Sequence, residues 1–399
     1  MAKGNFFVTV NDAKEIINRN VKGRAAVLLK TEQASGFVLA QTIKSPIHSP
    51  LFDHSAMDGF AFRYSDYSNG SKIFIEGESA AGSNYTHKLK RNQAVRIFTG
   101  AAIPNGADTV VMQEKVVRDE NKLVIMDPSL IKGANIRLKG SQISKGKSAI
   151  GKGTVLNPGS VGFVASLGIP AIKVFPKPRV AIVVTGNELI SPGKTIKLGQ
   201  IFESNSHTLL AALYEDRIHD VKVIRVKDDF EATKRVFEKT LKEFDFILFT
   251  GGISVGDYDF VSQVMEDSKV KTLFYKVKQK PGKPLYFGSK NSVMIFGIPG
   301  NPASVLTCYY EFVKPALQKF YGHPSPGTTI MHLELTESIF KKTGLTHFLK
   351  GVTDFKTVTP LPGQESYILK SFISANCLIV LNESETEKHA GDKVEVHLL

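Results

Sequence analysis

The chain has 399 residues, of which 42% are hydrophobic and 22% charged, so we expect a globular protein of about two to four domains. Its apolar runs are too short for a membrane span, no signal peptide is visible, and two cysteines cannot form a disulfide framework, so a cytoplasmic protein is expected. The net charge of +13 is compatible with nucleic-acid binding, but the lysines are spread along the chain without a basic arm, and small anionic substrates or a general basic bias explain the charge equally well.

The N-terminal part begins with a helix and continues into a domain crossing. Thr9 to Asp12, followed by Ala13 to Ile17, predicts a capped amphipathic helix. Lys44 to Pro50 holds two prolines and indicates a linker or domain crossing. Asp58 and Gly59 then stand just before strand-like Phe60 to Arg63, and taken alone this pair would indicate only a turn.

A small β-rich module is expected next. Short strand patterns between residues 72 and 126 are separated by Gly, Asn and Pro, and one of them leads into Thr99-Gly100-Ala101. A basic loop follows at residues 133–140, in which Arg137 could make a two-pronged contact with an oxyanion. A helix is predicted over Val161 to Leu167.

From Arg179 onward strands alternate with helices. Val180 to Val184 and Val221 to Val226 read as strands, and Ser204-Asn205 is expected to cap a helix that ends at Tyr214, with another helix over Phe230 to Phe244. This order predicts a parallel, doubly wound sheet, in which ligands bind beyond the carboxyl ends of the strands. The loops expected to meet at that rim are Thr185 to Glu188, Asp228-Asp229, Gly251-Gly252 and Gly297 to Pro302.

The richest stretch runs from Phe244 to Ala303. A buried strand ends in Thr250 to Asp259, a loop with three glycines and two carboxylates. If the chain is extended further on, Lys276, Lys278 and Lys280 lie on one face. Together these features predict a site for an anion with phosphate-like groups, assisted by a divalent metal. Tight turns, a solvated lysine face and helix capping by Asp257 and Asp259 are the alternatives, and neither a Walker loop nor a dinucleotide fingerprint is present.

The chain after His332 reads as a small β domain with turns at Pro360 to Gly363 and Ala390 to Asp392. We therefore expect a multidomain α/β plus β protein with a central doubly wound α/β domain. The expected boundaries are a discontinuous N-terminal helical and linker domain at 1–45 and 140–176, a small β-rich domain at 46–139, the α/β domain at 177–325 and a C-terminal β domain at 326–399.

Several motifs in this order carry a family resemblance. They are Ser55 to Gly59, Thr99 to Ala101 with Pro104, Asn135 to Arg137, Thr185 to Leu189, Gly251 to Gly256, Lys280 to Pro284 and Gly297 to Pro302. Over nearly its whole length the chain resembles the molybdopterin molybdenumtransferase (MoeA) family, which is similar to the C-terminal part of gephyrin. The resemblance implies molybdenum cofactor biosynthesis: molybdate is inserted into adenylylated molybdopterin, AMP is released and Mg²⁺ is required.

The resemblance also implies roles for individual residues. Catalytic roles fall to Asp58, Arg137, Glu188, Asp228, Asp259, Lys276 and Lys280. Substrate binding falls to Thr99, Thr185, Gly251, Gly252, Ser254, Gly256, Lys283, Pro299, Pro302, Lys350 and Ser371. Glu188 and Asp259 would hold the metal, because carboxylate oxygens suit Mg²⁺. In the family the site lies between the subunits of a homodimer, so Asp58 and Arg137 would reach into the partner's central domain.

The chain departs from the family pattern at a few positions. Ser141 and Gln142 replace an acidic pair, Lys350 stands where arginine is common, and Asn187 replaces an aspartate. These changes leave open a preference for tungstate, or a catalytically weakened scaffold that binds a pterin or a partner protein. Molybdopterin adenylyltransferase and molybdoenzyme maturation factors are the expected protein partners, with neither nucleic acid nor membrane involved.

Overall fold

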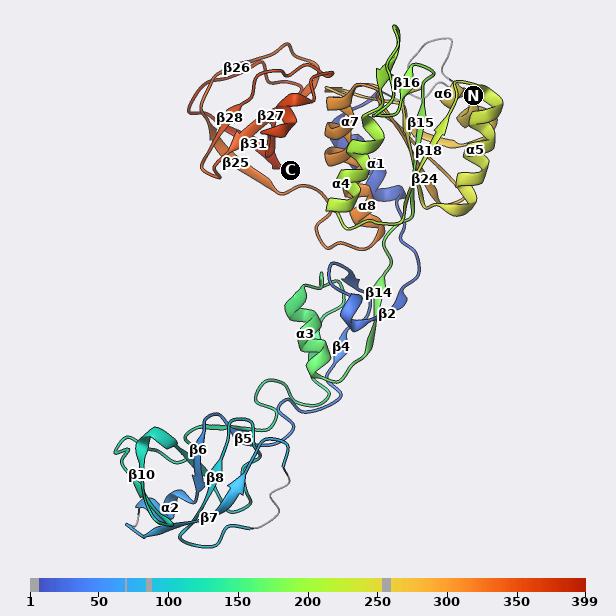
Figure 1. Ribbon diagram of the computed structural model, residues 1–399. Helices are drawn as coiled ribbons and strands as arrows, with labels where there is room; N and C mark the ends of the chain where they lie inside the picture. The colour runs from blue at the N-terminus through green and yellow to red at the C-terminus, as the bar shows by residue number, and fades with distance from the viewer. Residues whose placement is uncertain (1–6, 69, 84–87, 253–259) are drawn as a thin grey trace.

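The structure is a computed structural model that describes residues 7–68, 70–83, 88–252 and 260–399. Figure 1 shows an elongated molecule, with a large α/β body and a C-terminal β body at one end and a small β module at the other. A connector that carries α3 (Pro158–Ser166) lies between the two ends. The chain passes through the connector twice, because the small β module is inserted between the paired strands β4 (Ile43–Lys44) and β13 (Ser148–Ile150).

The large α/β body is built on a six-stranded sheet. Its parallel part consists of β18 (Val221–Val226), β15 (Val180–Thr185), β19 (Phe246–Thr250) and β24 (Val293–Ile298). β23 (Tyr286–Lys290) and β20 (Lys271–Phe274) continue the sheet in antiparallel orientation. Only β23 therefore runs against the other strands, since β20, antiparallel to β23, points the same way as β24. The sheet is mixed rather than wholly parallel, so the prediction of a parallel sheet is wrong for β23. Asn291 and Ser292 have φ angles of 49° and 68°, which suit a two-residue hairpin that turns the chain back on itself.

Helices cover both faces of this sheet, which confirms the doubly wound α/β class. Successive side chains of β15 point to opposite faces of the sheet. Ala181 and Val183 pack with α5 and α6 on one face, whereas Val180 and Ile182 pack with the other helices on the opposite face. The helices are α1 (Val10–Asn20), α4 (Asn205–Glu215), α5 (Phe230–Glu243), α6 (Phe260–Asp267), α7 (Pro302–Cys308) and α8 (Lys314–Phe320). A π-helical turn, Tyr309–Val313, joins α7 to α8. Within the described residues no helix is long and apolar enough to cross a membrane.

The N-terminal helix α1 belongs to the large α/β body. Thr9 caps it as expected, since its hydroxyl accepts the backbone N–H of Asp12 at 3.1 Å. Ala13 and Ile17 are buried in the core that also holds the π-helical turn and α8. The strand β1 (Phe7–Val8) pairs in parallel with β21 (Lys276–Val277). This placement differs from the expected grouping of residues 1–45 with 140–176, because the apolar face of α1 finds its partner in the α/β core.

The connector and the small β module each have their own sheet and core. In the connector, β14 (Ala171–Phe175) lies between β2 (Val27–Lys30) and β3 (Val38–Leu39), next to a short 3₁₀ helix at Thr31–Gln33. The sheet of the module follows the order β10 (Val116–Asp119), β11 (Lys122–Ile125), β7 (Ile73–Ser79), β8 (Gln93–Ile97), β6 (Gly59–Phe62) and β9 (Thr109–Met112). Its smaller elements are α2 (Tyr64–Ser68), a 3₁₀ helix at Gln113–Lys115, and the pair β5 (His54–Ser55) and β12 (Ile136–Arg137).

The C-terminal β body is a closed barrel. Its strands pair around a ring in the order β27 (Thr346–Thr353), β28 (Thr357–Pro360), β25 (Ile330–Leu335), β31 (Lys393–Leu398) and β29 (Cys377–Leu381), and β29 returns to β27. A small ribbon, β26 (Ile339–Phe340) with β30 (Glu387–Lys388), and a 3₁₀ helix at Lys370–Ile373 complete it. The short strand β22 (Gln279–Lys280) of the α/β body joins this barrel in parallel with the start of β27.

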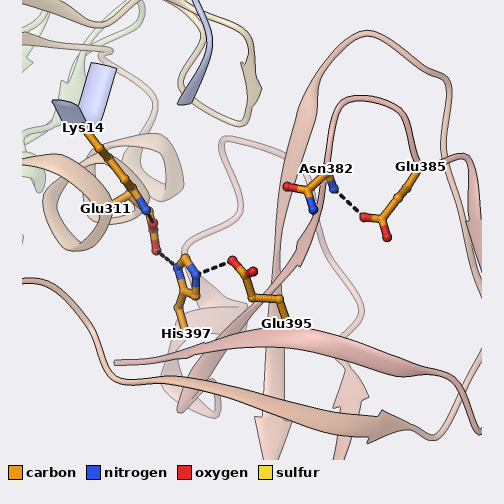
Figure 2. A network of polar contacts seen from close by, with 6 residues as sticks. All are labelled: Lys14, Glu311, Asn382, Glu385, Glu395 and His397. Atoms are coloured by element: carbon orange, nitrogen blue, oxygen red, sulfur yellow. Dashed lines mark hydrogen bonds and ion pairs between the residues drawn. The ribbon is translucent and has the colours of Figure 1, made fainter. Parts of the chain in front are cut away.

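A buried chain of charges ties the barrel to the α/β body. Figure 2 shows Glu311 of the π-helical turn between Lys14 of α1 and His397 of β31, at 2.7 and 2.8 Å. The other ring nitrogen of His397 lies 2.8 Å from Glu395, and the Glu311 side chain is 0% exposed. Nearby, the backbone N–H of Asn382 donates to Glu385. Because Lys14, Glu311 and His397 come from three separate elements, this junction fixes how the barrel sits on the α/β body.

Candidate functional site

The motifs of the small β module come together in space. The N–H of Ser55 donates to Ala101 O at 2.9 Å, and the N–H of Gly100 donates back to Ser55 O at 2.9 Å. The N–H of Ala56 donates to Asn135 O at 2.8 Å, and Arg137 pairs with His54 in the β5–β12 ribbon. Segments far apart in the sequence therefore form one surface that carries Asp58, Thr99 and Arg137.

Asp58 is held rigidly at this surface. Its Oδ1 accepts both the backbone N–H and the hydroxyl of Thr99, each at 2.8 Å. These bonds, with a smaller contribution from Arg96, lower the pKa of the Asp58 carboxyl below its ordinary value although some desolvation opposes the shift. Gly59 is required next to it, because a Cβ there would lie 1.9 Å from Val111 O. Asp58 is thus an ionised carboxylate in a fixed position.

The rim of the central sheet gathers the predicted loops. The N–H of Asn187 donates to Asp228 Oδ2 at 2.9 Å and the N–H of Asp228 donates to Asn187 Oδ1 at 3.3 Å, so the loops after β15 and β18 hold each other. Glu188 is exposed beside this pair. The hydroxyls of Thr185 and Thr250, at the ends of β15 and β19, are buried and have no hydrogen-bond partner among the described residues. A buried polar atom without a partner is a cost that a bound ligand could remove.

Gly251 and Gly252 bring their loop close to Thr185. Both have positive φ, 86° and 66°, and a Cβ on Gly252 would lie 2.8 Å from Thr185 Oγ1. Gly300 lies in the neighbouring loop, between Pro299 and Pro302. A Cβ added to Gly300 would lie 3.9 Å from the Cα of Gly251. A side chain at Gly251 or Gly252 would be strained by the positive φ and would crowd Thr185, so glycine is needed at both positions.

Two polar residues that the sequence did not single out hold the rim together. Asn205, at the start of α4, donates through Nδ2 to Gly300 O at 2.7 Å. It was expected only as part of a Ser204-Asn205 cap, but the Ser204 side chain makes no capping bond, and Glu203 accepts the N–H of Ser206 instead. The second residue is Ser366 of the barrel, whose hydroxyl accepts from Asn301 Nδ2 at 2.8 Å. No motif in the sequence distinguishes Ser366 from the other serines of the chain.

The lysine stretch has the predicted alternation. Val277 and Gln279 are 0% exposed, whereas Lys276 and Lys278 are half-buried and Lys280 is exposed. Lys280 pairs with His347 across β22 and β27, and burial, together with Lys341 and Lys280, lowers the pKa of His347 to about 4. The exposed Lys283 follows in the same loop. The loop that carries Gly282 and Lys283 packs on α7, the helix that follows the rim loop. The lysines and the rim therefore lie on neighbouring segments.

Gly282 is what allows that packing, and its replacement gives a first prediction. Its φ is 87°, and an added Cβ would lie 2.6 Å from Cys308 Sγ. We expect Gly282→Ala to lower the free energy of unfolding by about 2–4 kcal/mol, as a sum of backbone strain and overpacking. Urea unfolding checks this.

Gly146→Ala is the matched control for Gly282→Ala. Gly146 has a similar φ of 84°, but nothing lies within 4 Å of an added Cβ. The control measures the backbone term alone, and equal effects of the two substitutions would contradict the packing role of Gly282.

Lys350 and Ser371 lie in the barrel, and their polar groups contact backbone carbonyls of the barrel loop at residues 362–368. Lys350 is 2% exposed, and its Nζ donates to Gly363 O at 2.5 Å and to Ile368 O at 3.0 Å. Burial lowers the pKa of the Lys350 ammonium, and Glu365 opposes that shift. The Ser371 hydroxyl lies 2.8 Å from Pro362 O and from Gly363 O.

The predicted site residues thus form two groups. Glu188, Asp228, Thr185, Gly251, Gly252, Pro299, Pro302, the lysines and Ser371 lie on connected segments of the α/β body and the barrel. Asp58, Thr99 and Arg137 lie in the small β module, at the opposite end of the molecule in Figure 1. Ser254, Gly256 and Asp259 fall outside the described residues.

Gln142 lies where the chain re-enters the connector. Its Oε1 accepts from the Ser49 hydroxyl at 2.9 Å, and its N–H donates to Ser49 O at 3.0 Å. The amide therefore cross-links the two passes of the chain between the small β module and the connector.

A doubly wound domain with glycine loops, lysines and carboxylates at one rim is typical of enzymes that act on small phosphate-bearing molecules. Family models match the chain in three consecutive parts: the MoeA N-terminal region (domain I and II) at residues 8–168, a probable molybdopterin binding domain at 181–319 and the MoeA C-terminal region (domain IV) at 332–399. The chain belongs to the molybdopterin molybdenumtransferase (MoeA) family, which confirms the resemblance seen in the motifs.

Individual relatives agree with this family. A molybdopterin molybdenumtransferase of Haemophilus influenzae is 32% identical over 386 residues, covering 93% of this chain and 94% of its own. One from a Nostoc species is 33% identical over 379 residues, covering 91% and 86%. The crystal structure of a molybdopterin biosynthesis MoeA protein from Pyrococcus horikoshii matches with a TM-score of 0.83 at 29% identity, covering 98% of this chain and 100% of that one.

Proposed function

We propose that this protein inserts molybdate into adenylylated molybdopterin and releases AMP in a step that requires Mg²⁺. One observation supports this above the others: the glycine loops and the carboxylates Glu188 and Asp228 follow the carboxyl ends of β15, β18, β19 and β24, and the lysine-bearing loop packs on α7, which begins at the same rim. The adenylylated pterin carries several negative charges and molybdate is itself a dianion. A site for both needs backbone N–H groups, cations and a metal in one place.

The residues present fit Mg²⁺ by their chemistry. We assign the ion to Glu188 and Asp259, with Asp228 nearby. Asp259 lies outside the described residues. The described residues contain no group of three or more His, Cys, Asp or Glu placed to hold a metal. Mg²⁺ is commonly bound by one or two carboxylates together with water and substrate phosphate oxygens, so a complete protein cage is not needed. When bound, the ion would neutralise charge on the phosphates of the substrate.

We further propose a homodimer in which the small β module of one copy faces the rim of the other. Asp58 and Arg137 lie at the far end of the molecule from the rim of their own chain (Figure 1). Apolar side chains are exposed in both regions, at Ile196, Leu198 and Phe202 beside the ribbon β16 (Leu189–Ile190) and β17 (Ile201–Phe202), and at Leu51, Phe52 and Leu138 near Asp58. Patches of this kind mark protein interfaces.

The direct test incubates purified protein with adenylylated molybdopterin, molybdate and Mg²⁺ and follows AMP release. We expect release that depends on molybdate and falls at least about 100-fold in Lys280→Ala, because a charge that stabilises the transition state is lost. Lys239→Ala, which removes an exposed lysine from α5, is the matched control and should keep full activity.

The outcome separates the remaining functions. Molybdate-independent binding of the pterin without AMP release would favour the scaffold reading, which draws on the neutral Gln142. Faster AMP release with tungstate than with molybdate would identify a tungstate-inserting variant.

A further inference from the structure

The barrel loop at residues 361–371, which we name the strap, is folded around the side chain of Lys350. The Lys350 ammonium donates to Gly363 O and Ile368 O. The Lys350 backbone takes part as well, since its N–H donates to Gln364 Oε1 and its carbonyl accepts from Gln364 Nε2, both at 2.9 Å. The strap therefore obtains much of its shape from one residue of β27.

The Lys350 ammonium has little capacity left for a ligand. An ammonium has three N–H donors. Two are used by the strap carbonyls, and the nitrogen lies 5.6 Å from the centre of the Phe372 ring. With the residue only 2% exposed, an oxyanion could reach this nitrogen only if the strap opened and its carbonyls lost their donors.

The strap is also attached to the rim. The Ser366 hydroxyl accepts from Asn301 Nδ2 at 2.8 Å, and the carbonyl of Ser366 accepts from the N–H of Ala303 at 3.0 Å. Asn301 belongs to the rim loop and is the N-cap residue of α7, and Ala303 follows in the first turn of that helix. The strap is therefore held at two places, by Lys350 inside the barrel and by the start of α7.

A different lysine borders the open side of the strap. A cavity of about 340 Å³ is lined by Leu361, Pro362, Gly363, Ile368, Lys370, Ser371 and Ser374, and Lys350 is not in its wall. Lys370 is exposed and has no ion pair among the described residues. Its ammonium and the Ser374 hydroxyl border this space and suit a small tetrahedral oxyanion, whereas the single O–H of Ser371 is shared by Pro362 O and Gly363 O.

We propose that Lys350 is a positioning residue that holds the fold of the strap, and that Lys370 supplies the cation that an oxyanion contacts there. This proposal rests on the proposed function. Arginine, common at position 350 in the family, could bind an oxyanion with its fork. In this chain the ammonium of Lys350 instead donates hydrogen bonds to carbonyls of the strap. Oxyanion affinity then depends on Lys350 through the fold of the strap and on Lys370 through direct contact.

Hydrogen exchange tests the role of Lys350 without any substrate. Lys350→Met should raise the exchange rate of the Leu361 and Ile368 amides at least about tenfold, because the carbonyls that close the strap lose their donor. Lys350→Arg should restore most of the protection, since its guanidinium can donate to both carbonyls. Unchanged exchange in Lys350→Met would overturn this half of the proposal.

Lys370→Met, the same substitution at the neighbouring lysine, tests the direct contact. We expect unchanged strap exchange, a maximal rate of AMP release within about twofold of the wild type, and a half-saturating molybdate concentration raised about tenfold, as for one lost charge-assisted bond. A normal molybdate dependence in Lys370→Met would contradict the assignment. If the wild type released no AMP, the proposed function would fail, whereas exchange and calorimetric titration with molybdate alone would still decide both halves of this inference.

Discussion

Mixing an Asp58→Asn chain with a Lys280→Ala chain is expected to restore activity that neither variant has alone. Asp58 belongs to the small β module, and Lys280 belongs to β22, where the α/β body meets the barrel. Figure 1 shows these two parts at opposite ends of the molecule. If each site takes Asp58 from one copy and Lys280 from the other, a mixed dimer contains one intact site and one site with both substitutions.

The expected recovery can be stated as a fraction. Random exchange of equal amounts makes half of the dimers mixed, and half of their sites are intact, so about one quarter of wild-type AMP release should return. Asparagine at position 58 keeps the shape of the side chain, and its oxygen can still accept from Thr99, so the substitution removes charge with little effect on the fold.

The control replaces the Lys280→Ala chain by one that carries both substitutions. Its mixed dimer with Asp58→Asn has no site with both Asp58 and Lys280, so activity should stay at the background level. Full activity of a monomer at high dilution, or no recovery in dimers shown to have exchanged, would rule out a shared site.

Local structure could be predicted from the sequence because it depends on neighbouring residues. The strand Val221–Val226 was predicted with its observed bounds, since β-branched residues and flanking polar residues define it. The burial alternation over residues 276–280 also followed from the sequence, because Val277 and Gln279 are buried between more exposed lysines.

Long-range pairing could not be predicted in the same way. Nothing around Gln279 and Lys280 indicates that they join a barrel strand that begins at Thr346. The family resemblance implied that Lys350 meets the oxyanion, whereas its partners in the structure are carbonyls of a loop whose fold no periodic pattern describes. Such contacts depend on which surfaces the whole chain brings together.

Glu311 is a charged residue in an otherwise apolar segment, and such a residue indicates that charged partners lie close to it in the fold. It stands between Tyr310 and Phe312 in the π-helical turn, fully buried, where an unpaired charge would be very unfavourable. Burial by itself raises the pKa of its carboxyl, but Lys14 and His397 outweigh burial and leave the pKa below the ordinary value of 4.5. The carboxylate is therefore ionised and depends on both partners.

We expect Glu311→Gln to destabilise the protein strongly. Removing one member of a buried ion pair costs about 3–5 kcal/mol, because its partners lose their compensation, and here His397 stays buried while the Lys14 side chain is 34% exposed. For the α/β body and barrel this corresponds to a fall of roughly 6–20 °C in the unfolding midpoint at pH 7. Calorimetry measures it, and Glu15→Ala is the control: it breaks an exposed pair with Arg19 on the same α1 helix and should change stability by less than about 1 kcal/mol.

The pH dependence of this difference identifies its cause. Because the folded pKa of Glu311 is lowered, its contribution is fully present above the unfolded value near 4.5 and disappears as pH falls through the folded pKa. The wild type and Glu311→Gln should therefore differ most at neutral pH and converge below pH 4.5. A difference that stayed constant down to acid pH would attribute the loss to packing rather than to the charge at the junction between the barrel and the α/β body.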